Sequence, residues 1–132
     1  MLKKITVRSK QRNELIDITK EVMSAVKESK VRSGICSVYI PHTTAGVTIN
    51  ENADPSVKAD IISELNRLIP LSGRFTHSEG NSDAHVKASL VGSSVNVIIE
   101  DGSLLLGTWQ GIYFCEFDGS RTRTVYIKII SG

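Results

Sequence analysis

All three histidines of the chain lie in two short polar runs, His42–Asp54 and His77–His85. Neutral imidazole is the commonest protein ligand for zinc-like ions. Three histidines that leave one coordination position open are typical of a catalytic rather than a structural metal centre. We therefore expect the fold to bring His42, His77 and His85 together in one metal-binding site.

Three unrelated histidines on the surface or in the core are the alternative. Against it, each histidine lies beside small or polar residues. Each also lies near an expected element boundary: His42 follows a strand, His77 lies in a loop and His85 is in the first turn of a helix. The spacing matches no zinc-finger template, so the expectation rests on residue type and position.

Carboxylates near the histidines could fix each imidazole tautomer, as metal centres require. Asp54 is better explained as a helix cap than as a catalytic group. For Glu79 and Asp83 a functional role and a solvated loop are equally open. The acids available for this task are Glu51, Asp54, Glu79, Asp83 and Glu116.

Anion binding is the second chemistry that the residues suggest. The segment 80–84 stands at an expected helix start, where exposed backbone amides favour phosphate, although Asp83 adds negative charge there. A second set of groups could bind phosphate instead: Ser93, Ser94, Lys87, Arg121 and Arg123. Such groups also occur in many proteins that bind no phosphate.

Cys36 and Cys115 both lie in apolar, strand-like runs. We expect reduced, buried side chains, with a ligand or nucleophile role as the alternative. Trp109 is the only tryptophan, and we expect it to pack in the core beside a tight turn. An exposed Trp109 would instead offer a flat wall for a planar ring.

The bulk composition restricts the class of protein. A chain of 132 residues is most simply one domain over residues 1–132. A net charge of +2 with scattered basic residues argues against a nucleic-acid partner. No apolar run approaches the roughly 20 residues that span a bilayer, and the N-terminus lacks a signal-peptide core. We therefore expect a cytoplasmic protein with no membrane partner.

Strands dominate both ends of the chain and helices its middle. Alternation predicts strands over 2–8, 13–18, 35–41, 44–50, 94–100, 110–117 and 122–130. Apolar spacings of three and four predict helices that start at the caps Thr19, Asp54 and Ser82. Asp101-Gly102 and Asp118-Gly119 are hairpin turn signals. This order predicts an α+β domain, a mostly antiparallel β-sandwich with two to three helices.

Several blocks resemble the YjbQ-like family, also called the secondary thiamine-phosphate synthase family. They are the segments 42–46, 50–55, 77–87, 92–94, 106–111 and 116–119. The resemblance implies a compact β-sandwich domain that assembles as a homotrimer. It also implies a site made of His42, His77 and His85, with Glu51, Asn81 and Asp83 nearby.

The resemblance further implies a weak thiamine-phosphate synthase activity, the coupling of an aminopyrimidine methyl diphosphate with a thiazole phosphate. A diphosphate leaving group needs a divalent cation or basic side chains. The cation expected is zinc, with magnesium as the alternative. Lys87, Arg121 and Arg123 are the basic candidates.

Two other functions stay open. One is metal-assisted hydrolysis of a small metabolite, with Glu79 or Glu51 as the proton acceptor. The other is a trimeric module that binds a phosphorylated small molecule without turnover.

Overall fold

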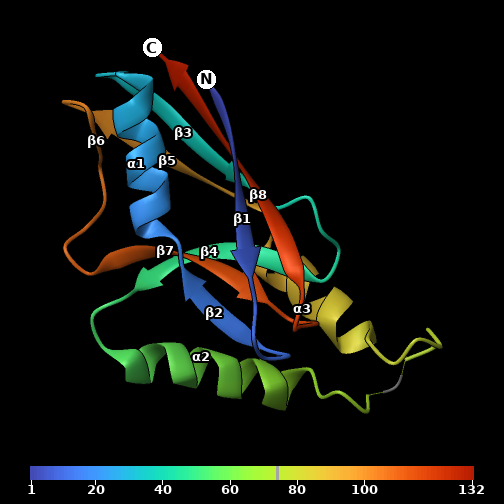
Figure 1. Ribbon diagram of the computed structural model, residues 1–132. Helices are drawn as coiled ribbons and strands as arrows, with labels where there is room; N and C mark the ends of the chain where they lie inside the picture. Colours follow the sequence, from blue (N-terminus) through green and yellow to red (C-terminus); the bar gives the residue numbers. More distant parts are fainter. Residues whose placement is uncertain (74) are drawn as a thin grey trace.

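The computed structural model describes residues 1–73 and 75–132. Within these residues, eight strands and three helices follow one another (Figure 1). Their bounds are β1 Leu2–Arg8, β2 Glu14–Asp17, α1 Thr19–Ser29, β3 Gly34–Tyr39, β4 Ala45–Glu51, α2 Pro55–Leu68, α3 Ser82–Val91, β5 Ser94–Glu100, β6 Ser103–Leu104, β7 Gln110–Glu116 and β8 Thr122–Ser131. None of the described helices is long and apolar enough to cross a membrane.

The strands form two antiparallel sheets. The five-stranded sheet has the order β1-β8-β3-β5-β6, and the three-stranded sheet has the order β2-β7-β4. Alternate residues of β7 face opposite sides of the three-stranded sheet. Ile112 and Phe114 point into the core between the sheets, and Tyr113 and Cys115 point towards α2 and α3. The expected α+β sandwich is therefore confirmed.

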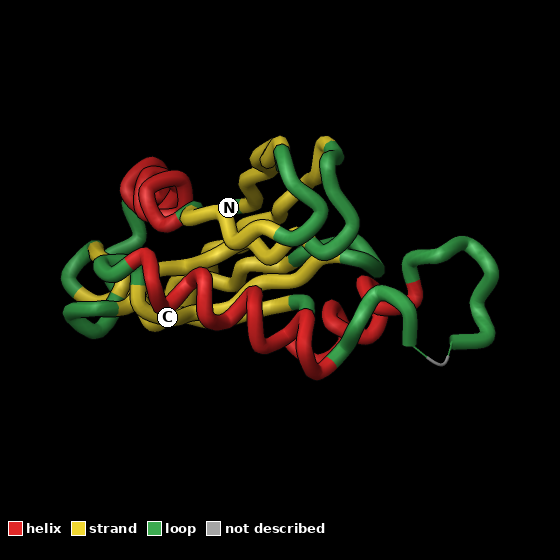
Figure 2. Tube along the Cα trace, turned by 90° about the horizontal axis from the view of Figure 1, so that it is seen from below, coloured by secondary structure: helices red, strands yellow, loops and turns green. Residues whose placement is uncertain are grey.

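Helix α1 closes the core between the two sheets. Val22, Ala25 and Val26 are buried there, at the spacings of three and four that the sequence predicts. Helices α2 and α3 cover the other face of the three-stranded sheet, where the long α2 lies in front of the strands (Figure 2). The molecule therefore consists of two sheets with α1 between them and a helical layer on one outer side.

Helix α2 packs more loosely than its pattern predicts. Ile61, Ile62 and Leu65 are half-buried, whereas Leu68, three residues after Leu65 and so on the same face, is exposed. The cap is as predicted: the Asp54 carboxylate accepts a 2.9 Å hydrogen bond from the Ser56 amide. The helix therefore begins where the sequence places it.

The outer face of the five-stranded sheet has no covering layer among the described residues. Register places Ile98 of β5 and Ile130 of β8 on either side of Ile35 in β3. All three side chains are exposed, at 51%, 53% and 41%. A row of three adjacent isoleucines in water is a large apolar surface for a single chain.

The hairpin turn predicted at Asp101-Gly102 is confirmed: it joins β5 to the two-residue β6, and Glu100 pairs with Ser103 across it. Other local predictions were wrong. Asp118-Gly119 connects strands of different sheets, so it makes no hairpin. The cap positions before α1 and α3 are Ile18 and Asn81, each one residue earlier than expected. The Asp17 carboxylate accepts from the Thr19 amide at 2.9 Å, so an acid upstream satisfies that helix start.

Candidate functional site

The two polar runs meet where β4 begins and α3 lies across it. His42 and His85 line one cavity of about 350 Å³. We call this space the histidine cavity; its lining residues are His42, Thr43, Ala45, His85, Ala88, Ser89, Gly92 and Ser93. Gly46 permits β4 to approach the end of α3 closely, since a Cβ at this position would lie 2.5 Å from the Gly92 carbonyl oxygen. The strand and the helix can therefore place both imidazoles against the same space.

His85 also contacts the third histidine. The rings of His77 and His85 are 5.4 Å apart between centroids and inclined at 65°, an edge-to-face arrangement. Both rings line a second cavity of about 350 Å³, which shares only His85 with the first. The three histidines therefore gather around His85, which stands between the two spaces.

His42 is held from behind by the backbone of β8. Its Nε2 accepts a 2.9 Å hydrogen bond from the Thr124 amide. An imidazole nitrogen that accepts carries no proton, so in the neutral ring the proton is on Nδ1. Burial lowers the pKa of His42, and the charge of Arg123 lowers it further. His42 is therefore a neutral imidazole whose Nδ1–H is available as a donor.

This arrangement does not fit a zinc-like centre held by three histidines. A metal ligand must offer a free lone pair, and the accepting lone pair of His42 is already used by Thr124. Across residues 1–73 and 75–132, no three or more His, Cys, Asp or Glu side chains are placed to hold one ion. In this geometry a divalent ion would have to rely on His77 and His85 without His42.

A buried ion pair fixes the turn that carries His42. Glu116 accepts from Arg123 Nε at 2.9 Å and from Arg123 Nη2 at 2.5 Å. Arg123 Nη2 also donates to Thr44 Oγ1 at 2.8 Å. Burial alone would raise the pKa of Glu116, but hydrogen bonds from Arg123, the Asp118 amide and Ser9 lower it below its ordinary value. Arg123, a candidate phosphate ligand, therefore lies inside the fold with Nε and Nη2 engaged.

Lys87 and Asp83 form a second buried network beneath α3. The Lys87 ammonium is 1% exposed and donates to Asn66 at 2.6 Å and to Asn13 at 3.1 Å. Asp83 accepts from Arg12 at 2.9 Å and lies 3.4 Å from the Lys87 ammonium. Burial lowers the pKa of Lys87, and Asp83 opposes that shift. These contacts join α3 to α2 and to the segment before β2, and they leave Lys87 no free face for a ligand.

Asn81 and Arg121 belong to a third group, centred on Asp118. The Asp118 Oδ2 accepts from Asn81 Nδ2 at 2.9 Å and from Arg121 Nη2 at 3.0 Å. Burial would raise the pKa of Asp118, but these hydrogen bonds lower it. Arg121 is half-exposed, so it is the one basic candidate of the three that solvent can reach.

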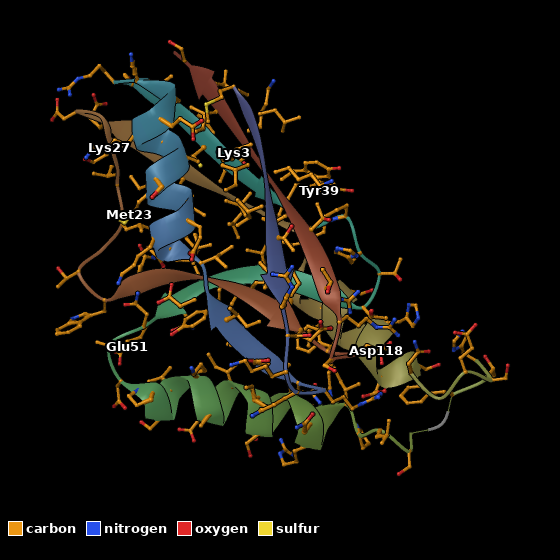
Figure 3. The ribbon with its side chains drawn as sticks, viewed as in Figure 1. Lys3, Met23, Lys27, Tyr39, Glu51 and Asp118 are labelled. Atoms are coloured by element: carbon orange, nitrogen blue, oxygen red, sulfur yellow. The ribbon has the colours of Figure 1, made fainter. Side chains whose placement is uncertain are left out.

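The remaining candidates are scattered. Glu51 ends β4, six residues beyond Ala45 in the histidine cavity, a distance of about 20 Å along a strand. Figure 3 shows Glu51 and Asp118 at opposite ends of the three-stranded sheet. Glu79 is exposed in the loop before α3, and Ser94 is exposed at the start of β5. Of the acids and hydroxyls that the sequence suggested, Ser93 alone joins His42 and His85 in the cavity.

Sequence reasoning missed two of the cavity hydroxyls. Ser89 lies four residues after His85 on α3, which places both on one helix face, so helical spacing could have identified it. Thr43 follows His42 directly, and only the turn geometry shows that it lines the cavity. The contribution of the Thr124 amide has no sequence signal, because any residue except proline carries that group.

The cysteines and the tryptophan divide between core and surface. Cys36 and Cys115 are buried as expected, and burial raises their pKa values to about 11 and about 12. Both thiols are therefore protonated at neutral pH and poor nucleophiles. The expectation for Trp109 was wrong: its side chain is 62% exposed, because it lies in the loop before β7, where its carbonyl accepts from the Asn52 amide.

Known proteins share this sequence over nearly its whole length. The model of the family described as UPF0047 protein YjbQ-like matches residues 3–132. A UPF0047 protein of Methanocaldococcus jannaschii is 62% identical over 130 residues, which cover 98% of this chain and 94% of that protein. The UPF0047 protein YugU of Bacillus subtilis is 53% identical over 131 residues, covering 98% and 99%.

Solved structures agree with the fold. The crystal structure of a YjbQ/UPF0047 family protein from Clostridium acetobutylicum superposes with a TM-score of 0.95 at 55% identity, covering 96% of this chain and 98% of that one. A YjbQ-like protein of Sulfolobus solfataricus superposes with a TM-score of 0.97 at 30% identity, covering 100% and 97%. From sequence and fold together, this chain belongs to the YjbQ-like UPF0047 family.

Proposed function

We propose that the chain is an enzyme that binds a small phosphorylated metabolite in the histidine cavity. The observation that carries this proposal is the convergence of His42 and His85, from two distant runs, on one space rimmed by hydroxyls. Its volume of about 350 Å³ is near the small end of ligand pockets. A compact metabolite fits this space better than a polymer.

The cavity offers hydrogen-bond donors to an anion. His42 presents Nδ1–H because Thr124 occupies Nε2. Ser93 adds a hydroxyl, which donates to phosphate oxygens. The Ser89 hydroxyl lines the same cavity but already donates to the His85 carbonyl at 3.0 Å. His85 lies against both the cavity and His77, and imidazole exchanges protons near neutral pH. In the proposed site His85 is therefore the acid–base group and His42 the fixed donor.

We further propose that thiamine-phosphate synthase activity is a weak activity of this site. In that reaction the thiazole nitrogen attacks the methylene carbon of the pyrimidine, a C–N bond forms, and diphosphate leaves with the electron pair of the broken C–O bond. The enzyme must stabilise the negative charge of the leaving group. The cavity lining holds neutral donors and no Lys or Arg, which supports a slow reaction.

Assembly as a homotrimer is part of the proposal. The exposed row of Ile35, Ile98 and Ile130 is a surface that a second copy could cover. Glu51 lies about 20 Å along β4 from the histidine cavity. It could act on a ligand there only from a neighbouring subunit.

A non-catalytic binding role is the second candidate. The observation that favours it is the absence of any Asp or Glu from the residues that line the histidine cavity. Glu79 and Glu51, the proton acceptors of a hydrolase, lie outside that lining as well, so hydrolysis has the least support.

Single-turnover assays with excess protein and the two phosphorylated substrates test the proposal. We expect slow product formation that His85→Ala abolishes and Ser93→Ala slows. Ser63→Ala, which removes an exposed helical hydroxyl from α2, is the matched control and should change nothing. Saturable substrate binding without product would favour the binding module. Neither binding nor product, or activity that survives His85→Ala, would overturn the assignment.

A further inference from the structure

A second, larger hollow lies on the opposite side of the molecule from α3, along α1. It has a volume of about 810 Å³, compared with about 350 Å³ for the histidine cavity, and the two share no residue. Helix α1 forms one wall, and the turn after β5 with the segment through Leu106 forms the other. We call it the α1 groove. A volume of this size accommodates a drug-sized organic molecule.

The floor of the α1 groove is apolar. Val26 is buried, and Leu104 and Leu106 are half-buried against the core. Met23 projects from α1 with 51% of its surface exposed, and Figure 3 places it with Lys27 on the side of the helix that faces the segment after β6. Methionine is flexible and polarisable, and it adapts to apolar ligands of varied shape.

The rim of the groove is basic. Lys20 and Lys27 are seven residues apart on α1, so they flank Met23 on one helix face. The Arg32 guanidinium lies against the opposite wall, since Nη1 is 2.9 Å from where a Cβ of Gly102 would be. Asp101 is the one acid among the lining residues. The lining therefore carries three cations and one anion.

None of these three cations forms an ion pair with any described residue. Glu28, the acid next to Lys27, is already paired with Lys3 at 3.0 Å on the other side. By contrast Arg12, Lys87, Arg121 and Arg123 all contact carboxylates. Lys27 also suits the last turn of α1 electrostatically, but that does not explain Lys20 or Arg32. Unpaired cations beside exposed apolar surface favour a ligand that offers both an anion and a hydrocarbon body.

The charges also orient such a ligand. A smaller hollow of about 420 Å³ continues from the groove past Met23 towards the start of α1, where its lining includes Asp17 and Glu21. These acids repel a negative headgroup from that end. At the other end the lining includes Lys27 on α1 and Arg32, whose guanidinium lies against the opposite wall.

We propose that the α1 groove binds a free amphiphilic carboxylate, with its hydrocarbon body on Met23, Leu104 and Leu106 and its headgroup between Lys27 and Arg32. The proposal is independent of the histidine cavity, because no lining residue is shared. If ligand binding fails at one of the two sites, the proposal for the other site is therefore unaffected.

Titration of the full-length ¹⁵N-labelled chain with octanoate tests the proposal. We expect saturable amide shifts at Met23, Lys27 and Ser103. Acetate lacks the hydrocarbon body and 1-octanol lacks the charge, so each should bind at least about tenfold more weakly. Equal binding of 1-octanol, or shifts centred on the outer isoleucines Ile35, Ile98 and Ile130, would overturn the assignment.

Variants separate the groove from general charge effects. Arg32→Glu and Lys27→Glu should each raise the octanoate Kd at least about tenfold, and Met23→Glu should do the same by placing an acid on the floor. Lys10→Glu reverses an exposed charge outside the groove and is the matched control. Binding that survives Arg32→Glu and Met23→Glu sinks the proposal. So does attachment of the protein to phospholipid vesicles without any binding of monomeric octanoate.

Discussion

The Thr124 amide donates to Nε2 of His42 across 82 positions of sequence, at 2.9 Å. The residue before Thr124 holds the same turn at its other end, because Arg123 donates to Thr44 Oγ1 at 2.8 Å. Two consecutive residues of β8 therefore fix both the orientation and the protonation state of His42. The proposed role of His42 as a donor into the histidine cavity depends on this arrangement, so the tautomer of His42 is the first property to test.

We predict that His42 exists as the Nδ1–H tautomer in the folded protein at neutral pH. The reason is that Nε2 accepts a hydrogen bond from the Thr124 amide. A backbone N–H is a donor only, so a proton on Nε2 would have no acceptor there. Long-range ¹H–¹⁵N spectra of the imidazole rings distinguish the two tautomers directly. Spectra that place the proton on Nε2 would remove the fixed-donor role proposed here.

Stability should also depend on the protonation of His42. Burial and the charge of Arg123 hold the pKa of His42 below 6.5, so the unfolded chain takes up this proton at higher pH than the folded one. The contribution of neutral His42 to the unfolding free energy is therefore complete above pH 6.5. It falls as the pH decreases through the lower pKa that His42 has in the folded protein. Carboxylates whose pKa values are lowered in the fold, such as that of Glu116, change the unfolding free energy only at lower pH.

Urea unfolding at a series of pH values between about 7.5 and 5 measures this effect. We expect His42→Gln to flatten the decline in unfolding free energy over that window. His77→Gln, a substitution at an exposed histidine, is the matched control and should keep the decline. An unchanged slope in His42→Gln would show that other groups cause it.

The sequence predicted the positions of helices and strands better than it predicted which polar side chains are buried. Val22, Ala25 and Val26 repeat at helical spacing, and the Asp54-Pro55 pair marks a helix start, so local patterns sufficed for α1 and α2. The burial of Lys87 could not be predicted, because its partners Asn13 and Asn66 are 74 and 21 positions away. A buried lysine looks the same in sequence as a solvated one until its partners are placed.

The histidines show the same limit. Residue type predicted that His42 and His85 belong together, and the fold places both on one cavity. The direction of each ring lone pair depends on contacts such as the Thr124 amide, which no side-chain pattern records. Sequence therefore identified the group of residues more reliably than their ligand geometry.

Breaking the buried Glu116–Arg123 pair should strongly destabilise the fold. Arg123→Met leaves the Glu116 carboxylate buried without its main partner, a change that typically costs about 3–5 kcal/mol. The double variant Glu116→Gln/Arg123→Met should recover part of this loss, since no unpaired charge remains. Urea unfolding of the single and double variants measures both values.

The matched control for this pair is on the surface. Arg67→Met breaks the exposed Arg67–Glu64 pair of α2, and exposed pairs contribute little to stability. We expect its unfolding midpoint to stay close to that of the wild type. A loss in Arg67→Met as large as that in Arg123→Met would contradict the importance of burial.

Self-association should depend on the outer face of the five-stranded sheet. Under the proposed homotrimer, light scattering on a sizing column should give three times the chain mass for the wild type. Ile35→Asp places a charge at the centre of the row formed with Ile98 and Ile130, so we expect a monomer. Leu68→Asp alters another exposed apolar side chain, on α2, and should keep the trimer. A monomeric wild type would remove the trimer from the proposal.

The metal content of the protein should not depend on His42. Its Nε2 lone pair is engaged by Thr124, so we expect His42→Ala to leave the zinc or magnesium content unchanged, whatever its level. Elemental analysis of protein purified without an affinity tag measures this content, with His77→Ala and His85→Ala analysed in parallel. A stoichiometric ion that is lost on His42→Ala would show that the ring releases the Thr124 amide to bind metal. The three histidines would then form a metal centre, and the fixed-donor role of His42 would be wrong.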